Sequence, residues 1–119
     1  MKIEISQING ISIAEIISES IIINSTQDVL DIMGNCNYQG STRIIIHEKN
    51  LIPAFFDLKT GIAGDILQKF STYSVRLALV GDFTKYSSKS LKDFIFESNR
   101  YGRVVFVCSV NEAKERLAK

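Results

Sequence analysis

Residues 44 to 81 constrain the fold more than any other part of the chain. The segment begins with three consecutive isoleucines, and it ends with a second apolar run from Val75 to Val80. Uninterrupted β-branched runs are typical of strands that are covered on both faces, as in parallel sheets. Between these runs, apolar residues recur at helical spacing from Ile62 to Tyr73. The segment therefore predicts a buried strand, a polar loop, a helix and a second buried strand.

The amino-terminal residues predict a β-hairpin. Isoleucines alternate with polar residues between residues 3 and 16, on both sides of Asn9-Gly10. Asn-Gly between alternating runs favours a two-residue turn, because that turn needs positive φ at both positions. Residues 17 to 23 are apolar without a clear period, and we interpret them as a connection that crosses the sheet edge.

Capping residues predict where the first helix begins and ends. Ser25 and Asp28 have the spacing of a capping box. Apolar residues follow at helical spacing, and we expect the helix to end at Gly34 or Gly40.

The later helices have similar signals. Lys59 or Thr60 precedes the second helix, and Ser87 or Ser88 precedes the third. The run at residues 104 to 107 predicts the last strand, followed by an amphipathic terminal helix.

The predicted order is β-β-α-β-α-β-α-β-α. Strands that alternate with helices favour a mostly parallel sheet with flanking helices, here preceded by an antiparallel hairpin. The chain has 119 residues and no repeat or linker, so we expect residues 1–119 to form a single α/β domain. The exposed edge of the hairpin is a candidate surface for a homodimer.

Charge and cysteine content narrow the functional classes. Fourteen basic and thirteen acidic residues leave a net charge of +1, which argues against partners such as nucleic acid or anionic membrane. No apolar run approaches the ~20 residues of a membrane span, and the first residues lack the pattern of a signal peptide. Cys36 and Cys108 have no metal-binding spacing, so we expect buried, reduced thiols in a cytoplasmic protein.

Polar residues follow the predicted parallel strands, where open α/β sheets usually bind ligands. His47 and Glu48 follow one strand, and Asp82 with Lys85 follows another. A pair of His47 and Asp82 would make a general base, and Asp57 lies in the loop between them. Each of these residues also has an ordinary structural interpretation, as a turn, cap or solvated residue.

Catalytic and cofactor fingerprints are absent from the sequence. Gly61-Ile62-Ala63-Gly64 lacks the spacing of a dinucleotide-binding loop, and Lys59-Thr60 precedes its glycine instead of ending a phosphate-binding loop. One histidine with scattered carboxylates is too few ligands for a metal site. We therefore expect no metal and no cofactor.

Three stretches resemble a known family. His-Glu-Lys-Asn-Leu at residues 47 to 51, Phe-Phe-Asp-Leu-Lys-Thr-Gly-Ile-Ala-Gly at residues 55 to 64, and Val-Gly-Asp-Phe at residues 80 to 83 closely resemble the bacterial domain of unknown function 4180. The resemblance covers nearly the whole chain and carries no activity.

The element order and residues 55 to 64 are more distantly similar to STAS domains of anti-sigma factor antagonists. In that family an Asp-Ser-Ser-Gly-Leu-Gly segment opens the helix after the third strand, and a partner kinase phosphorylates its serine or threonine. Asp57, Thr60, Gly61 and Gly64 occupy the comparable places. Asp57 is separated from Thr60 by one residue more than in the family pattern. The resemblance implies a STAS-like fold and makes Thr60 the candidate phosphorylation site.

Two functional hypotheses follow. The first is a non-enzymatic regulatory domain whose protein partner contacts the second helix and the loops around Thr60 and Asp82. Phosphate at Thr60 would place charge on that docking surface. The alternative is a small enzyme or ligand-binding protein that uses a strand-end cluster of His47, Asp57 and Asp82. The first is favoured, because the chain lacks a metal constellation and a cofactor fingerprint.

Overall fold

One five-stranded sheet organises the chain, and the computed structural model describes all of its residues, Met1–Lys119. The strands lie in the order β1-β2-β3-β4-β5, the same order as in the sequence. Their bounds are β1 Lys2–Ile8, β2 Ile11–Ile17, β3 Arg43–His47, β4 Arg76–Val80 and β5 Val104–Val107. The helices are α1 Thr26–Tyr38, α2 Ile62–Thr72, α3 Lys89–Tyr101 and α4 Val110–Leu117. The predicted order of elements and the mixed, mostly parallel sheet are both confirmed.

The amino-terminal hairpin forms as the sequence predicts. Strands β1 and β2 pair antiparallel, with Ile8 opposite Ile11 at the turn. Asn9 and Gly10 have φ values of 54° and 78°. These positive values are those that a two-residue turn between twisted strands requires.

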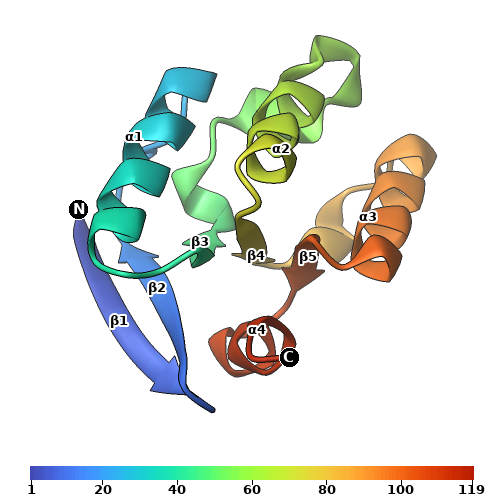
Figure 1. Cartoon of the computed structure of the whole chain (residues 1–119). Coiled ribbons are helices and arrows are strands. Elements are labelled where there is room, and N and C mark those ends of the chain that lie inside the picture. Colours follow the sequence, from blue (N-terminus) through green and yellow to red (C-terminus); the bar gives the residue numbers. More distant parts are fainter.

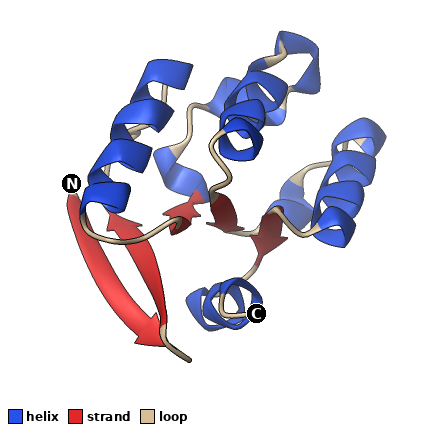
Figure 2. Cartoon of the chain, in the orientation of Figure 1, coloured by secondary structure: helices blue, strands red, loops and turns tan.

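Helices cover the two faces of the sheet unequally (Figure 1). From β2 onward each crossover leads to the next parallel strand on the same side. Since such crossovers keep one hand, α1, α2 and α3 fall on one face. Figure 2 shows these three helices on one side of the strands and α4 alone on the other. None of the helices has the length and apolar character needed to cross a membrane.

Alternation along the strands explains the uninterrupted apolar runs. Ile44 and Ile46 belong to a core of 21 buried residues beneath α1, α2 and α3. Ile45, between them, belongs to a second core of 8 buried residues that includes Ala113 and Leu117 of α4. Successive residues of β3 thus pack into apolar cores on opposite faces of the sheet, which is the pattern expected of a strand covered on both faces.

Several predicted boundaries need correction. Helix α1 continues through Gly34, and Gly40, with φ 87°, follows its end. The residue that caps α2 is Gly61, with φ 76°, while Thr60 ends a short 3₁₀ helix before it. Tyr73 was expected on the inner face of α2, but it is 57% exposed, because the helix ends at Thr72.

The connection at residues 17 to 23 is tied to the loop after β3. Ile23 forms an isolated parallel bridge with Leu51. The buried Asn50 donates from Nδ2 to the carbonyl oxygens of Ser18 and Ser20, at 2.9 Å each. These bonds satisfy backbone carbonyls that the ladder leaves unpaired.

The two cysteines are free thiols in different surroundings. Cys36 of α1 is buried, and burial raises the pKa of its thiol to about 11. Cys108, directly after β5, is exposed. The expectation of burial is therefore wrong for Cys108, because the chain has already left the sheet at that residue.

Candidate functional site

Loops from several elements meet at one edge of the sheet, which we call the carboxyl edge. Because β2 to β5 are parallel, the residues after their carboxyl ends lie along it. The loop after β3 contributes three short 3₁₀ helices, Glu48–Asn50, Pro53–Phe56 and Leu58–Thr60. This edge also holds the loop after β4 and the start of α4. Most of the site residues predicted from the sequence lie here.

His47 pairs with a carboxylate that sequence reasoning missed. Its Nε2 lies 2.8 Å from Oε2 of Glu15, and the two side chains are 25% and 14% exposed. In the β2–β3 register Glu15 lies opposite Ile45, and Ile45 is two residues before His47 on the same strand. The two side chains therefore point to the same face from neighbouring strands. A sequence signal did exist, since Glu15 interrupts the apolar alternation of β2.

The proposed pair of His47 and Asp82 does not form. Oδ1 of Asp82 instead accepts from the backbone N–H of Thr84 at 3.1 Å and from its hydroxyl at 2.5 Å. These hydrogen bonds, more than the charge of the neighbouring Lys85, lower the pKa of the Asp82 carboxyl. Asp82 thus caps the short turn after β4.

Asp57 is also a local cap and does not reach the strand-end residues. Its Oδ1 accepts from the backbone N–H of Lys59 at 3.2 Å. Neither Asp57 nor His47 lines any of the five best-formed hollows of the surface. No three His, Cys, Asp or Glu side chains come together as a metal site. The predicted cluster of His47, Asp57 and Asp82 is thus three separate local arrangements.

Glu48 joins the two principal loops of the carboxyl edge. Its Oε2 accepts from Nζ of Lys85 at 2.7 Å and from the hydroxyl of Tyr86, and its side chain is only 13% exposed. The Tyr86 ring stacks on Phe56, with 4.8 Å between the ring centroids. Burial, followed by the hydrogen bond and charge of Glu48, raises the pKa of Tyr86. The sequence indicated Glu48 and Lys85, whereas Tyr86 was missed.

Gly81 makes this arrangement possible. A Cβ at position 81 would lie 2.6 Å from Cβ of Glu48. Glu48 therefore packs directly against the backbone where β4 ends. Glycine is required here by this close approach and not by its φ value.

Thr60 lies at the surface immediately before α2. Its Oγ1 is 2.8 Å from the carbonyl oxygen of Asp57 and 2.9 Å from that of Ala54. The same oxygen accepts from the backbone N–H of Ile62 at 3.2 Å. The hydroxyl thus closes the last 3₁₀ turn and satisfies one free N–H of the helix.

The surroundings of Thr60 are open. A Cβ added at Gly61 or Gly64 would meet no atom within 4 Å. Lys59 is exposed beside Thr60, and Asp65 lies in the first turn of α2. The amino end of α2 therefore presents backbone and small side chains to the outside.

A hollow of about 550 Å³ opens on the other side of the β4 loop. Asp82 and Lys92 line it together with Cys108 and Glu112. Oε1 of Glu112 accepts from the backbone N–H of Cys108 at 3.1 Å, which fixes the start of α4. Sequence reasoning missed Lys92 and Glu112, because each looks like a solvated residue on a helix.

The comparisons with known proteins agree with this architecture. The model of the family described as Domain of unknown function (DUF4180) matches residues 8–117. The chain belongs to this family. No protein of curated function matches it.

A solved structure shares the fold. It is the crystal structure of a candidate anti-sigma factor antagonist from Thermotoga maritima, with a TM-score of 0.53 and 14% sequence identity. The match covers 98% of this chain and 95% of that chain. This DUF4180 domain therefore has a STAS-like fold, as the resemblance implied.

Proposed function

We propose that residues 1–119 form one regulatory domain that binds a partner protein in the cytoplasm through its carboxyl edge and performs no catalysis. The observation that carries the proposal is that Thr60 is an exposed residue at the amino end of α2, where its hydroxyl caps the N–H of Ile62. The whole-chain likeness to a candidate anti-sigma factor antagonist supports this role, because such a protein acts on another protein.

Phosphorylation of Thr60 would act on this surface through charge. A phosphate adds roughly −1.5 to −2 charge at neutral pH. At Thr60 it would lie beside the free N–H groups of α2, which favour an anion. The fold would therefore tolerate the modification, while a partner seated on the same helix end would meet a new charge.

The shape of the carboxyl edge suits close approach by a partner. Gly61 and Gly64 leave open space above the first turn of α2. Lys59 and Asp57 flank Thr60 on the exposed side and are the polar contacts that we expect a partner to use. The link from Glu48 to Lys85 and Tyr86 holds the neighbouring loops in place. A preformed surface of this kind binds without a large ordering cost.

The proposal is tested by partner capture with Thr60→Glu and the matched variant Thr60→Val. Valine keeps the shape of threonine and adds no charge, so it separates the charge from the loss of the hydroxyl. We expect Thr60→Glu to lose the proteins that wild type recovers from a lysate of the source cell. Thr60→Val should recover them.

Both variants need a stability control. Thr60 makes local caps only, so each variant should unfold within about 1 kcal/mol of wild type. The proposal is wrong if Thr60→Glu is folded and recovers the same partners in the same amounts as wild type.

The enzyme hypothesis has weaker support. It required His47, Asp57 and Asp82 to work together, and each has a different local partner. The pair of His47 and Glu15 has the geometry of a base with its orienting carboxylate. Neither residue of this pair lines any of the five best-formed hollows of the surface, where a substrate would bind.

A further inference from the structure

Four of the chain's five arginines gather at the edge opposite Thr60, which we call the amino edge. Arg43 and Arg76 begin β3 and β4, and Arg103 directly precedes β5. Arg116 lies in the last turn of α4. The net charge of the whole chain is only +1. The positive charge of these residues is thus concentrated and not part of a general basic surface.

Three of these guanidinium groups contact helix ends, and Arg116 is one of them, donating from Nη2 to the carbonyl oxygen of Asn99 in α3 at 3.0 Å. Nη2 of Arg76 donates to the carbonyl oxygen of Arg116, and Nη1 donates to that of Lys119, both at 2.9 Å. Nη1 of Arg43 donates to the carbonyl oxygens of Leu117 and Lys119. Such contacts are favourable, because the carboxyl end of a helix carries partial negative charge.

No carboxylate side chain neutralises the cluster. The only arginine in an ion pair with an acidic side chain is Arg100, which lies outside it and pairs with Glu97 at 3.7 Å. Burial, and then the charges of Arg43, Arg103 and Arg116, lower the pKa of Arg76. The cluster therefore holds like charges together without a counter-charge from the chain's acidic side chains.

Arg103 is the member without a structural role. Its side chain makes no hydrogen bond and no ion pair. With Arg76, Tyr101 and Gly102 it lines a hollow of about 420 Å³. Tyr101 is 85% exposed beside it. A free guanidinium and an exposed aromatic ring at a hollow are features of recognition surfaces.

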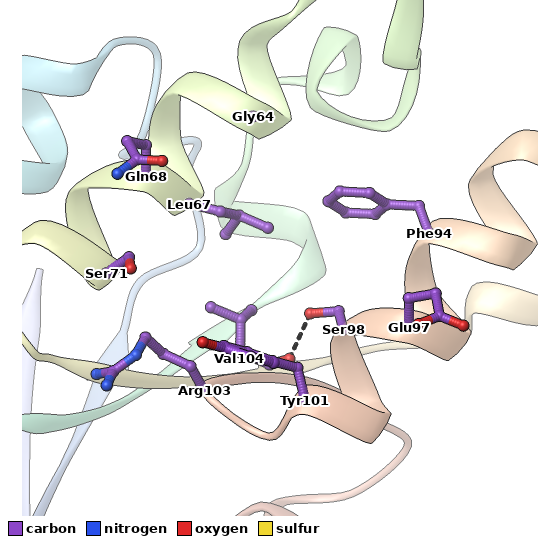
Figure 3. Close-up of a pocket in the computed structure, with 10 residues that line it drawn as sticks. All are labelled: Gly64, Leu67, Gln68, Ser71, Phe94, Glu97, Ser98, Tyr101, Arg103 and Val104. Carbon is purple, nitrogen blue, oxygen red and sulfur yellow. Dashed lines mark hydrogen bonds between the residues drawn. The ribbon is translucent and has the colours of Figure 1, made fainter.

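This hollow continues into an apolar groove between α2 and α3. The groove has a volume of about 430 Å³, and Tyr101 and Arg103 line it as well, together with Gly64 of α2 and Glu97 of α3. Figure 3 shows Leu67 and Phe94 pointing toward one another across it, with Val104 below. One surface thus has an apolar half between the helices and a cationic half at the amino edge.

We propose that this surface binds an acidic, amphipathic segment of a partner protein. Apolar side chains of the segment enter the groove, and a carboxylate pairs with the free guanidinium of Arg103, while Arg76 adds positive charge beside it. Arginine matches a carboxylate with two parallel hydrogen bonds. A nucleic acid fits less well, since the exposed surface of the groove is mainly apolar and its lining has a single basic residue, Arg103, together with the acidic Glu97. The inference extends the proposed function by naming the chemistry of a partner segment, but it does not depend on Thr60.

The test selects short peptides from a random phage library on the immobilised wild-type chain. We expect the selected peptides to combine apolar residues with aspartate or glutamate. Labelled copies are then measured by fluorescence polarisation against wild type, Arg103→Glu and Arg100→Glu. Reversal of the charge at Arg103 should weaken binding by about tenfold or more. Arg100→Glu makes the same charge change outside both hollows. It also removes the ion-pair partner of Glu97 in the groove lining, so it gives the upper limit of a general charge effect and should weaken binding by less than about threefold.

Further binding measurements test where on the surface the peptide binds. Replacing its apolar residues by serine, or raising the ionic strength, should also weaken binding. The groove reaches Gly64, one turn of α2 after Thr60, so Thr60→Glu should weaken peptide binding much less than Arg103→Glu does, and this difference separates the inference from the proposed function. Selection of peptides without acidic residues, equal binding by Arg103→Glu, or a loss of binding in Thr60→Glu as large as in Arg103→Glu would each overturn the inference. Competition by a single-stranded RNA oligomer without any peptide binding would overturn it in favour of a nucleic-acid site.

Discussion

At the scale of single residues, the carboxyl edge depends on contacts between residues that are distant in the sequence. Glu48 is held by Lys85 and Tyr86, and His47 is held by Glu15. Each contact crosses from one loop or strand to its neighbour. The side chains of Glu48, His47 and Glu15 are mostly removed from water, so their polar groups need partners, whereas Lys85 is 56% exposed. Such pairs fix the positions of neighbouring loops and strands relative to one another.

The hydroxyl of Tyr86 should make stability depend on pH in the alkaline range. Because its folded pKa is raised, the unfolded chain loses this proton first, near the ordinary tyrosine pKa of ~10. Between the two values the folded state binds more protons, so the free energy of unfolding falls as pH rises. Tyr86→Phe should cost about 1 kcal/mol at neutral pH and make the alkaline fall shallower.

Urea unfolding of wild type and Tyr86→Phe across the alkaline range checks this expectation. Tyr101→Phe is the matched control at neutral pH, because the Tyr101 side chain is 85% exposed and its loss should leave stability unchanged. Parallel pH profiles for wild type and Tyr86→Phe would show that the contact with Glu48 contributes nothing.

Contacts between residues distant in the sequence are the part of the site that could not be predicted from the sequence. The caps at Ser25 and Ser88 were predictable, because each depends on residues three positions away. The pairing of His47 with Glu15 depends on the register between β2 and β3, which no local pattern gives. The cap that Asp82 makes on Thr84 is also a local contact, between residues two positions apart. The sequence hypothesis paired Asp82 with His47 instead, which is distant in the sequence.

At the scale of elements, helix α2 begins later than its capping signal predicts: the residue before the helix is Gly61, one residue after Thr60. Thr60 is a good capping residue, and its hydroxyl does accept from the N–H of Ile62. The helix nevertheless begins after Gly61, because the chain must turn through a positive φ between the 3₁₀ helix and α2. Three successive 3₁₀ helices in one loop leave no periodic signal, so the sequence could only predict a polar loop.

The two glycines of this region should respond to alanine in opposite directions. Gly61 has φ 76°, where alanine is strained, so Gly61→Ala should destabilise the fold by about 1–2 kcal/mol. Gly64 lies within α2 with open space at its Cβ position, so Gly64→Ala should stabilise it by about 0.5–1 kcal/mol.

Chemical denaturation of the two single variants and of the double variant measures both effects. The double variant should lie between the two. A stabilising effect of Gly61→Ala would mean that the turn before α2 does not hold its positive φ in solution.

At the scale of the whole molecule, the two layers of helices are unequal. The core beneath α1, α2 and α3 contains 21 buried residues, and the core beneath α4 contains 8. The alternation of strands and helices sufficed to predict this class of fold, since the hand of each crossover fixes the face. The free edge of β1 remains the surface where a second copy would extend the sheet, and dimer formation stays a prediction.

The inequality of the layers predicts where the molecule opens first. Helix α4 has 8 residues and buries only Ala113 and Leu117. Its carboxyl end is held by donors from Arg43 and Arg76. We expect its amides to exchange with solvent through a partial opening, with a free energy below that of global unfolding, while α2 amides exchange only on global unfolding.

Native-state hydrogen exchange at several urea concentrations separates the two processes. Arg76→Ala removes two contacts to the end of α4 and should lower the opening free energy of α4 more than that of α2. The matched variant Arg100→Ala lies on α3, away from α4 contacts, and should lower neither by more than about 0.5 kcal/mol. Equal protection of α4 and α2 in wild type would mean that the smaller core is as cooperative as the larger one. In that case the arginine cluster would couple the two faces of the sheet, and Arg76→Ala should then weaken both helices together.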